Sequence, residues 1–375
     1  MRICHVLETA GGGSAQVALD LARYALNRGD DVTVLYAPDR AEAKFSVALA
    51  SLPKVNILTS PMQRKVGLRD LRDGWLLFKT LRKALPFDII HAHSSKAGAL
   101  ARIVGLFVPG KVIYTPHCFY SMTPGASKIY ASIERVLSWL APKIILVSQY
   151  EFRHAEQIGI AKNKLALIPN GITVTFPVTR EQARKNLQIN DNGIVIGFVG
   201  RMEPQKNPIR AIRAFQQIAD QFPATQLVMV GDGALRAEME AVLTDLDLNK
   251  RVSLLGQCDA RSVIPAFDCL LCSSDFEAMP ITFLEALATG IPIVTTPVGG
   301  TDEAVFEGLT GFIAKTPSVS DLATALTNFL NFRPEQRQKM AENAHKYSAL
   351  FTTEIMGERH NELYKECLSR LSLSQ

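Results

Sequence analysis

Short apolar runs alternate with amphipathic stretches along the 375 residues, and this alternation predicts an α/β protein. The runs contain few polar positions, which is typical of strands that are buried on both faces of a parallel sheet. In the first half they predict strands at 2–7, 32–36, 55–58, 88–92, 111–115, 143–147 and 165–168. In the second half they predict strands at 194–199, 226–230, 252–255, 268–272 and 292–295.

The alternation occurs twice, and a polar segment separates the two sets. Residues 168–193 contain two prolines and no long apolar run, so we interpret 171–192 as a linker with one helix near 181–187. The pattern therefore predicts two doubly wound Rossmann-like domains that face each other across a cleft. Ligands of such sheets bind beyond the carboxyl ends of the strands, so the loops after strands should carry the chemistry.

Composition and charge narrow the class of protein. A length of 375 residues favours two domains, and the net charge of +5 with a pI near 8.8 is mild. That charge is compatible with an anionic small ligand or a membrane surface, and it is too weak to indicate nucleic acid. The six cysteines are dispersed, the first residues do not resemble a signal peptide, and no apolar run reaches membrane-span length. We therefore expect a cytosolic protein with reduced thiols.

A glycine-rich loop, "LETAGGGSAQ", follows the first predicted strand. Gly11, Gly12 and Gly13 allow close approach of the backbone to a ligand, and a helix N-terminus favours anions. The loop fails the dinucleotide-binding fingerprint, because Gln16 stands where the third glycine belongs. We interpret it as a loop over a phosphate or a sugar; the alternative is a tight strand-to-helix turn.

Two cations lie in the loop "GRMEPQKNP", after the strand at 194–199. Asn207 and Pro208 are a typical N-cap and first helical residue, so Arg201 and Lys206 belong to the loop itself. A guanidinium fork and an ammonium beside a helix start suit a diphosphate. A solvated loop with two cations is the alternative interpretation.

Two glutamates eight positions apart flank a predicted helix start in "SSDFEAMPITFLEALATG". Pro280 is predicted to be the first helical residue, so the amides of Ile281, Thr282 and the next residue lack helical partners and can hold an anion. Glu277 precedes them, and Glu285 lies one turn later. Carboxylates accept hydrogen bonds from sugar hydroxyls, whereas a dipole-complementing role would explain Glu277 alone.

Histidines and cysteines raise the alternative of a metal site. "HAH" places His91 and His93 on one side of a strand end, and His117 could join them. No acidic partner is evident, so we favour satisfied strand-end histidines and expect no metal. Cys269 and Cys272 are three residues apart in a strand and point to opposite faces, which predicts separate core residues.

A basic stretch precedes the fourth predicted strand. It has seven cations (Arg64, Lys65, Arg69, Arg72, Lys79, Arg82 and Lys83) and one helical stripe (Leu68, Leu71, Trp75, Phe78, Leu81 and Leu85). A basic amphipathic helix can bind an anionic membrane. We favour a helix whose stripe faces the core and whose charges face water, with cations that can still attract a lipid surface.

Several motifs together resemble a known family. "LIPNGI", "GRMEPQK", "VGDGALR" and "FEAMPITFLEALATGIPIVTTPVGGTDE" are similar to those of the retaining nucleotide-sugar glycosyltransferases of family 4, which have the GT-B fold. The resemblance covers nearly the whole chain. It includes "FTTEIMGERHNELYKECL", which is similar to the terminal helix that returns to the first domain. Pro280 stands where many members have glycine.

The resemblance implies a role for each matching position. His117 and Glu277 would act at the transferred sugar, and Glu285 would accept from the ribose. The implied donor-binding set is Gly12, Gly13, Arg201, Lys206, Pro280, Ile281, Thr282 and Glu285. Residues 1–175, with a terminal helix at about 351–375, would form the acceptor-side domain, and 190–350 would bind the donor.

The expected reaction is transfer of a hexose-type sugar, with retention and without a metal or other cofactor, to a glycan hydroxyl. A UDP-sugar is favoured over a GDP-sugar. The segment "FYSMTPGASKIYASIERVLSWLA" resembles the acceptor side of bacterial surface-polysaccharide enzymes, which implies a lipid-linked acceptor. We therefore expect the protein in the cytoplasm, with peripheral contact with the cytoplasmic face of the inner membrane as an open alternative. The alternatives are an epimerase or phosphorylase of the same fold, or a non-catalytic nucleotide-sugar binding protein.

Overall fold

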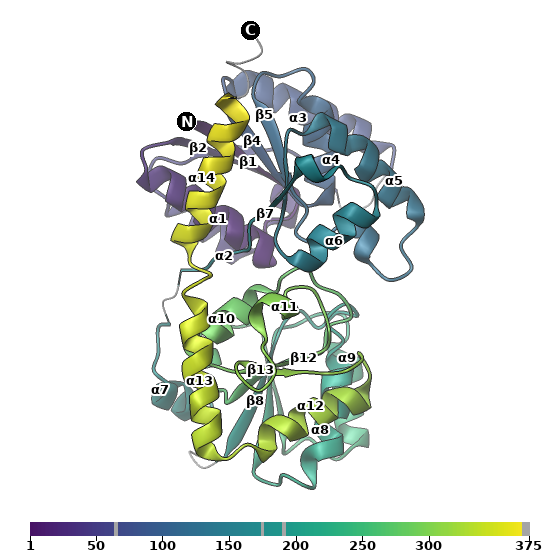
Figure 1. Ribbon diagram of the computed structural model, residues 1–375, viewed down its shortest axis with the longest axis vertical. Helices are drawn as coiled ribbons and strands as arrows, with labels where there is room; N and C mark the ends of the chain where they lie inside the picture. Colours follow the sequence, from purple (N-terminus) through teal and green to yellow (C-terminus); the bar gives the residue numbers. More distant parts are fainter. Residues whose placement is uncertain (64–66, 174–175, 190–192, 370–375) are drawn as a thin grey trace. The chain divides into compact units, whose positions relative to one another are not determined.

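The computed structural model describes residues 1–63, 67–173, 176–189 and 193–369. The chain divides into two compact units, Met1–Thr173 with Phe351–Gln375 (unit 1) and Val174–Leu350 (unit 2), both visible in Figure 1. Arg64 and Lys65 of the basic stretch lie outside the described residues. So do 174–175 and 190–192 of the predicted linker and 370–375 of the predicted terminal helix.

Unit 1 is built on a parallel sheet of seven strands in the order β3-β2-β1-β4-β5-β6-β7. The strands are β1 (Arg2–Leu7), β2 (Asp31–Tyr36), β3 (Asn56–Thr59), β4 (Ile89–His93), β5 (Lys111–Thr115), β6 (Ile144–Leu146) and β7 (Leu165–Leu167). The helices are α1 (Gly12–Asn27), α2 (Ala43–Ala50), α3 (Arg69–Ala84), α4 (Ser95–Val104), α5 (Lys128–Leu137), α6 (Gln149–Gln157) and α14 (Thr353–Ser369). Chain order reverses between β1 and β4, which makes this the topological switch point.

Unit 2 has a parallel sheet of six strands in the order β10-β9-β8-β11-β12-β13. The strands are β8 (Ile194–Val199), β9 (Thr225–Val230), β10 (Val252–Gly256), β11 (Cys269–Cys272), β12 (Ile293–Thr295) and β13 (Gly311–Ile313). The helices are α7 (Arg180–Asn186), α8 (Pro208–Ala219), α9 (Arg236–Asp245), α10 (Ile281–Thr289), α11 (Thr301–Ala304), α12 (Val319–Asn331) and α13 (Pro334–Ser348). Its switch point lies between β8 and β11.

Two doubly wound parallel sheets confirm the predicted α/β class, and the predicted strands are confirmed to within two residues at each end. The strand β13 was not predicted, because three residues that begin with glycine are too short to show a strand pattern. All six strands of unit 2 contribute apolar side chains to one core, which also includes residues of α8 and α12. Cys269 belongs to this core, and Cys269 and Cys272 are both buried, free thiols.

Only part of the predicted apolar stripe of α3 faces the core. Leu68, Leu71 and Trp75 are 89%, 77% and 53% exposed. The helix buries Leu81 of the stripe together with Leu77. The error arose because apolar residues occupy two sides of this helix, and periodicity alone does not tell which side meets the sheet.

The segment predicted as a linker contains one helix, and this helix packs on unit 2. The helix α7 is confirmed within one residue, and it packs beside residues 264–266. Arg180 and Arg184 each donate to the Asp268 carboxylate, at 2.6 and 2.7 Å. Asp268 also accepts from the Val195 amide at 2.7 Å, so α7 is tied to the start of β8.

The terminal helix α14 packs on α1 of unit 1. Gly357 is required there, because a Cβ at this position would lie 2.4 Å from the Tyr24 ring. The Tyr364 hydroxyl lies 2.7 Å from His91 Nδ1 in β4, and the chain reaches the helix through a bridge between Ile172 and Thr352. The last described segment of the chain thus completes the core of the first unit.

Candidate active site

The two loops that flank the switch point of unit 2 carry the charged residues singled out from the sequence. The loop after β8 runs to the helix α8 and contains Arg201 and Lys206. The loop after β11 runs to α10 and contains Glu277. Parallel doubly wound sheets bind ligands at this place, so the fold assembles the two predicted loops where a ligand would bind.

Lys206 and Glu277 form an ion pair, with Lys206 Nζ 2.7 Å from Glu277 Oε1. The Ser274 hydroxyl donates to the same carboxylate oxygen at 2.9 Å. Burial alone would lower the pKa of the Lys206 ammonium, but the charge of Glu277 and its hydrogen bond outweigh that effect and raise it. Lys206 is therefore cationic at neutral pH, and Glu277 holds it in place.

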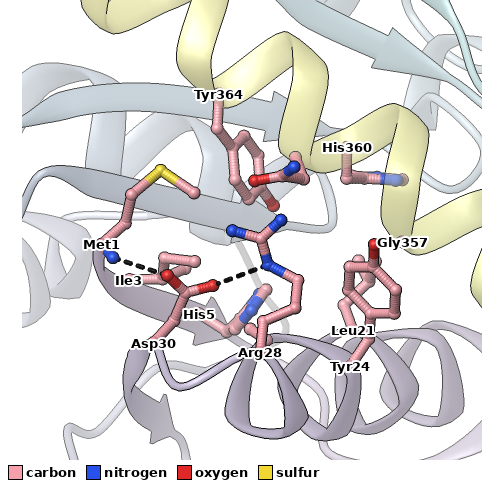
Figure 2. Close-up of a pocket in the computed structure, with 12 residues that line it drawn as sticks. Met1, Ile3, His5, Leu21, Tyr24, Arg28, Asp30, Gly357, His360 and Tyr364 are labelled. Atoms are coloured by element: carbon pink, nitrogen blue, oxygen red, sulfur yellow. Dashed lines mark hydrogen bonds and ion pairs between the residues drawn. The ribbon is translucent and has the colours of Figure 1, made fainter.

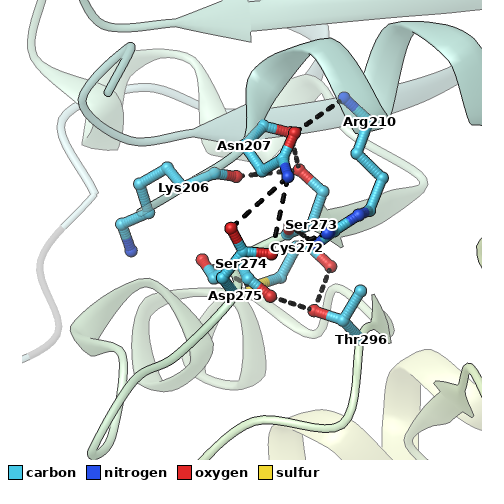
Figure 3. A network of polar contacts seen from close by, with 8 residues as sticks. All are labelled: Lys206, Asn207, Arg210, Cys272, Ser273, Ser274, Asp275 and Thr296. Atoms are coloured by element: carbon cyan, nitrogen blue, oxygen red, sulfur yellow. Dashed lines mark hydrogen bonds and ion pairs between the residues drawn. The ribbon is translucent and has the colours of Figure 1, made fainter. Parts of the chain in front are cut away.

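A network of polar contacts next to Lys206 joins the two loops (Figure 3). The Ser273 hydroxyl donates toward the carbonyl oxygens of Lys206 and Asn207, at 2.9 and 2.8 Å. Arg210 forms an ion pair with Asp275 at 2.6 Å and donates to the Ser273 carbonyl at 2.8 Å. These contacts fix both loops, so Lys206 stands on a rigid support.

The start of α8 is formed as the sequence predicted. Asn207 is the N-cap, its side chain accepts from the Arg210 amide at 3.2 Å, and Pro208 is the first helical residue. Asn207 has a left-handed backbone with φ of 46°, which this residue type tolerates. The turn places Lys206 directly before the helix and leaves Arg201 strongly exposed at the other end of the loop.

The start of α10 differs by one residue from the prediction. Pro280 is the N-cap, because its ψ of 126° is extended, and the helix begins at Ile281. The Phe283 amide donates to the Pro280 carbonyl at 3.0 Å, so only the amides of Ile281 and Thr282 remain of the three predicted anion donors. The first turn has no acidic residue and no side-chain cap, so these amides are available to an anion.

Glu285 lies in the second turn of α10 and is half-buried. Its carbonyl accepts from the Thr289 hydroxyl at 2.6 Å. Glu277 is more deeply buried and belongs to the loop before the helix. The two glutamates therefore flank the helix start along the chain, and the roles predicted for their carboxylates stay predictions.

The loop "VGGTDE" supports Glu277. A Cβ on Gly299 would lie 2.3 Å from the Glu277 carbonyl oxygen, so the backbones approach as closely as only glycine allows. Gly300 is the N-cap of α11 with φ of 83°, a left-handed conformation that suits glycine. In the sequence this loop stood out only as the end of a family motif, and the structure gives it a supporting role.

In unit 1, the glycine-rich loop leads from β1 into α1. Gly11 is the N-cap, and Gly12 and Gly13 form the exposed first turn. Gly12 has φ of 68° with open space beside its Cα, and the first turn has no acidic residue. The backbone is therefore accessible to a ligand, as the sequence predicted.

His117 follows β5 and is the outermost member of a chain of imidazoles. Its Nε2 lies 2.9 Å from His93 Nδ1, and His93 Nε2 lies 3.1 Å from His5 Nδ1. A neutral imidazole has one donor and one acceptor, so the tautomer of His117 fixes those of the other two. His5 Nε2 is buried and has no partner at the far end.

Burial keeps the whole cluster uncharged. Desolvation is the largest cause in each case, and it lowers the pKa of His5 and His117 to about 3 and that of His360 to about 4. The pKa values of His91 and His93 are also well below the usual range. At neutral pH the site of unit 1 therefore presents imidazoles that donate and accept hydrogen bonds but carry no charge.

The same cluster bears on the predicted absence of a metal. His5, His91 and His93 each offer a nitrogen, and these atoms lie within 4.8 Å of one another. His117 does not belong to this group. Both nitrogens of His91 are engaged, by Tyr364 and by Thr115 at 2.8 Å, so hydrogen bonds account for its position.

Glu151 supports the His117 loop and was not predicted from the sequence. Its carboxylate accepts from the amides of Cys118 and Val147, at 2.7 and 2.9 Å. His117 and Cys118 both have positive φ, 53° and 98°, so the loop needs such a support. Desolvation raises the pKa of Glu151 to about 7. The sequence signal was the capping pattern "SQYE", in which Ser148 accepts from the Glu151 amide.

A pocket in unit 1 lies between α1 and the terminal helix α14 (Figure 2). Asp30 on its wall pairs with the Met1 ammonium at 2.5 Å and with Arg28 at 3.2 Å. His5 and His360 also line it, so it borders the inner end of the imidazole chain. None of the predicted site residues lines this pocket.

The fold and the site define a class of protein. Pairs of doubly wound α/β units with ligand loops at their switch points are the architecture of GT-B glycosyltransferases. HepE of Anabaena was solved in complex with UDP and glucose. Its structure superposes on this one with a TM-score of 0.84 and 22% sequence identity, and the match covers 97% of this chain and 99% of the HepE chain. WaaG, a glycosyltransferase involved in lipopolysaccharide biosynthesis, matches 97% over 99% with a TM-score of 0.77 and 19% identity.

Sequence comparison places the chain within this class. The family model "Glycosyltransferase Family 4" matches residues 11–176, and "Glycosyl transferases group 1" matches residues 179–347. The UDP-Gal:alpha-D-GlcNAc-diphosphoundecaprenol alpha-1,3-galactosyltransferase of Escherichia coli is 31% identical over 277 residues, which are 69% of this chain and 70% of the relative. The chain belongs to glycosyltransferase family 4, and it is a glycosyltransferase of bacterial surface-polysaccharide synthesis.

Among the described residues, no helix combines the length and the apolar character needed to cross a bilayer.

Proposed function

We propose that the protein transfers a hexose-type sugar from a nucleoside diphosphate donor to a glycan hydroxyl, with retention of anomeric configuration. The observation that carries the proposal is the Lys206–Glu277 pair at the switch point of unit 2, 2.7 Å apart beside the free amides of α10. The ammonium and the amides suit a diphosphate, and the carboxylate suits the hydroxyls of the attached sugar.

Different groups of this site bind different parts of the donor. Arg201, Lys206 and the amides of Ile281 and Thr282 bind the diphosphate, and Glu285 accepts from the ribose hydroxyls. In the free protein Lys206 is paired with Glu277. When the donor binds, its phosphate replaces Glu277 in part as the partner of the Lys206 ammonium. The Glu277 carboxylate can then accept a hydrogen bond from a hydroxyl of the transferred sugar.

Retention follows without a protein nucleophile. Glu277 accepts a hydrogen bond from the Ser274 hydroxyl, and in the donor complex it would also accept one from a hydroxyl of the transferred sugar, so we assign it no nucleophilic role. We propose that the leaving phosphate helps to deprotonate the acceptor hydroxyl on the face that it vacates. The two-carboxylate arrangement of retaining glycosidases therefore does not apply. Cationic side chains and helix amides neutralise the diphosphate, so the reaction needs no metal.

A uridine donor and a lipid-linked acceptor are favoured by the relatives. The similar enzyme of Escherichia coli is named for UDP-Gal and for a diphosphoundecaprenol acceptor, and HepE was solved with UDP. We therefore propose a UDP-hexose donor over a GDP-sugar, and a lipid-linked glycan acceptor in the cell envelope. Such an acceptor would place the protein in the cytoplasm, in peripheral contact with the inner membrane.

The experiment is a panel of UDP-, GDP- and ADP-sugars tested by thermal shift, followed by nucleotide release with a lipid-linked acceptor. Ligand binding to the native state raises the melting temperature. We expect a UDP-hexose to give the largest shift and to release UDP only when acceptor is present. An epimerase would convert the sugar without acceptor, and a non-catalytic binder would release no nucleotide. A phosphorylase would need phosphate and a pyridoxal lysine.

A further inference from the structure

The imidazole chain of unit 1 has two different ends. The outer ring, His117, is partly buried, and its Nδ1 has no hydrogen-bond partner in the part of the protein that the structure describes. The inner rings, His93 and His5, are each 1% exposed. Contacts of 2.9 and 3.1 Å join the three rings in series. The proposed function uses only the outer ring, so the two buried rings need a separate explanation.

A series of neutral imidazoles can hold its protons in only two ways. Each ring has one N–H donor and one acceptor nitrogen, and each contact between rings needs one of each. Both contacts join Nε2 of one ring to Nδ1 of the next or the previous one, so the protons lie on Nε2 in all three rings or on Nδ1 in all three. In the first arrangement Nδ1 of His117 is an acceptor, and in the second it is a donor.

The inner end of the series reaches the pocket between α1 and α14 (Figure 2). His5 lines this pocket, and its Nε2 is buried without a partner among the described residues. Asn361 lines it too, and its Oδ1 is in the same condition. The pocket has a volume of about 10 Å³, which is close to the room that one water molecule needs. Buried polar groups without partners are costly, so we expect one water to bridge His5 and Asn361.

Asn361 gives the series its direction, because an amide oxygen can only accept. A water that donates to Asn361 Oδ1 and accepts from His5 Nε2 continues the series from His117 without a reversal. With the protons on Nδ1, the same water would have to donate to both groups, and the direction would reverse at the water. Hydrogen bonds that run in one direction polarise and strengthen one another. The arrangement with protons on Nε2 is therefore favoured.

We propose that His5 and His93 are positioning residues, which together with Asn361 keep Nδ1 of His117 as a hydrogen-bond acceptor at the outer end of the series. A single ring cannot change its tautomer alone, because all three protons would have to shift together. An acceptor at this position can bind the hydrogen of a hydroxyl group. That this hydroxyl belongs to the transferred sugar rests on the proposed function, whereas the direction of the protons is a property of the free protein.

The tautomers can be observed directly. The full chain is labelled with nitrogen-15 in its histidine rings, and two-bond proton–nitrogen correlation spectra are recorded at neutral pH without ligand. We expect protonated Nε2 and unprotonated Nδ1 for His5, His93 and His117. His360 is the internal control with the opposite pattern, since its Nδ1 lies 2.8 Å from the Met356 carbonyl and must donate. Protons on Nδ1 of the three rings, or averaged signals, would overturn the proposal.

A change on α14 tests whether the inner end controls the outer one. Asn361→Leu removes the acceptor at the pocket without altering any partner of His117, so the His117 signals should become those of a tautomer mixture. The matched control is Tyr364→Phe, one turn further along the same helix and on the same pocket wall. It removes a 2.7 Å contact with His91, which is outside the series, and should leave His117 as in the parent. Unchanged His117 signals in Asn361→Leu would contradict the proposed control.

Transfer rates show whether the buried rings act through His117. His5→Phe should slow transfer roughly 2- to 13-fold, since the contact that it weakens is one neutral hydrogen bond. His5→Asn places an amide near the position of Nδ1 and should recover most of the rate. Added to His117→Ala, His5→Phe should cause no further loss. Additive losses in the double variant would mean that His5 supports the fold and does not act through His117.

The two proposals fail in different ways. The spectra are recorded on the free protein, so they decide this inference even where no nucleotide sugar is transferred, a result that would contradict the proposed function alone. UDP affinity should be the same in His5→Phe as in the parent, because the series belongs to unit 1 and the proposed phosphate site to unit 2. A fall in UDP affinity in step with the rate would show a general loss of structure and would overturn the positioning role.

Discussion

The two units have the same parallel architecture, yet their switch points differ in charge. In unit 1 the strand ends carry imidazoles that burial keeps neutral. In unit 2 they carry ion pairs, Lys206 with Glu277 and Arg210 with Asp275. Neutral hydrogen-bonding groups suit hydroxyls, whereas a fixed ammonium suits a phosphate. Under the proposed function, the same fold would thus provide a sugar-facing site in unit 1 and a phosphate-binding site in unit 2 through different loops and strand-end residues.

The largest expected effect concerns stability in acid. Six of the seven histidines belong to unit 1, and only His345 lies in unit 2. Folded imidazoles with a lowered pKa bind fewer protons than unfolded ones, so their stabilisation is present above pH 6.5 and is lost as the pH falls toward the folded values. Each histidine with a pKa near 3 should cost about 2 kcal/mol at pH 5.

Glu151 acts in the opposite direction. Its raised pKa of about 7 gives stability that is present below the unfolded value and lost as the pH rises through 7. Between pH 7 and pH 5 this gain in stability offsets the loss caused by about one histidine. Hydrogen exchange at pH 7 and 5, followed peptide by peptide, should show unit 1 losing protection before unit 2. Equal loss in both units would contradict the assignment of neutral imidazoles to unit 1.

The next largest effect is that of Lys206→Ala on nucleotide binding. Loss of a charge-assisted hydrogen bond should weaken the binding of UDP by about 1.5–3 kcal/mol, which is roughly a 10- to 150-fold loss of affinity. The variant also leaves Glu277 without its cation, so Lys206→Arg is included to keep the charge. Calorimetry measures the affinity, and Lys250→Ala, on the exposed surface of unit 2, is the control. Unchanged UDP affinity in Lys206→Ala would disprove the phosphate-binding role.

A smaller effect is expected for His117→Ala. The lost contact is a neutral hydrogen bond of about 0.5–1.5 kcal/mol, so transfer should slow roughly 2- to 13-fold while UDP affinity stays the same. Steady-state rates and calorimetry on the same preparation separate the two quantities. His345→Ala is the control. A parallel loss of rate and UDP affinity would mean that His117 is structural.

The smallest expected effect is that of chelation. The proposed site neutralises the diphosphate with side chains and helix amides, so EDTA should change the transfer rate less than about twofold, within the range of a single weak interaction. A rate that falls with EDTA and returns with magnesium or manganese would contradict this. A rate that returns only with zinc would instead point to His5, His91 and His93.

The sequence predicted most of what local patterns encode. Strand positions, the cap at Asn207, and the loop with Arg201 and Lys206 depend on neighbours along the chain, and they agree with the structure. The motif resemblance identified the family. The alternation of strands and helices was also sufficient to place both charged loops beyond the carboxyl ends of their strands. That these two strands are neighbours at the switch point is known only from the sheet order.

Contacts between distant segments were not predictable in the same way. Burial of His5 beside His93 depends on β1 pairing with β4, and the bond between His91 and Tyr364 joins residues 273 positions apart. The Lys206–Glu277 pair joins two loops that were each assigned a ligand role but no mutual contact. Pro280 was misplaced by one residue because its ring fits both an N-cap and a first helical position.

The most direct test of the account compares two variants, Glu277→Gln and Glu285→Gln, by calorimetry with UDP beside a transfer assay. Glu285→Gln should weaken UDP by about 1.5–3 kcal/mol, since a charge-assisted hydrogen bond to the ribose is lost. Glu277→Gln should leave UDP affinity unchanged or higher, because it removes a negative charge beside Lys206, and it should lower transfer. Equal loss of UDP affinity in both variants, or a glycosyl adduct trapped on either glutamate, would contradict the division of the donor between them.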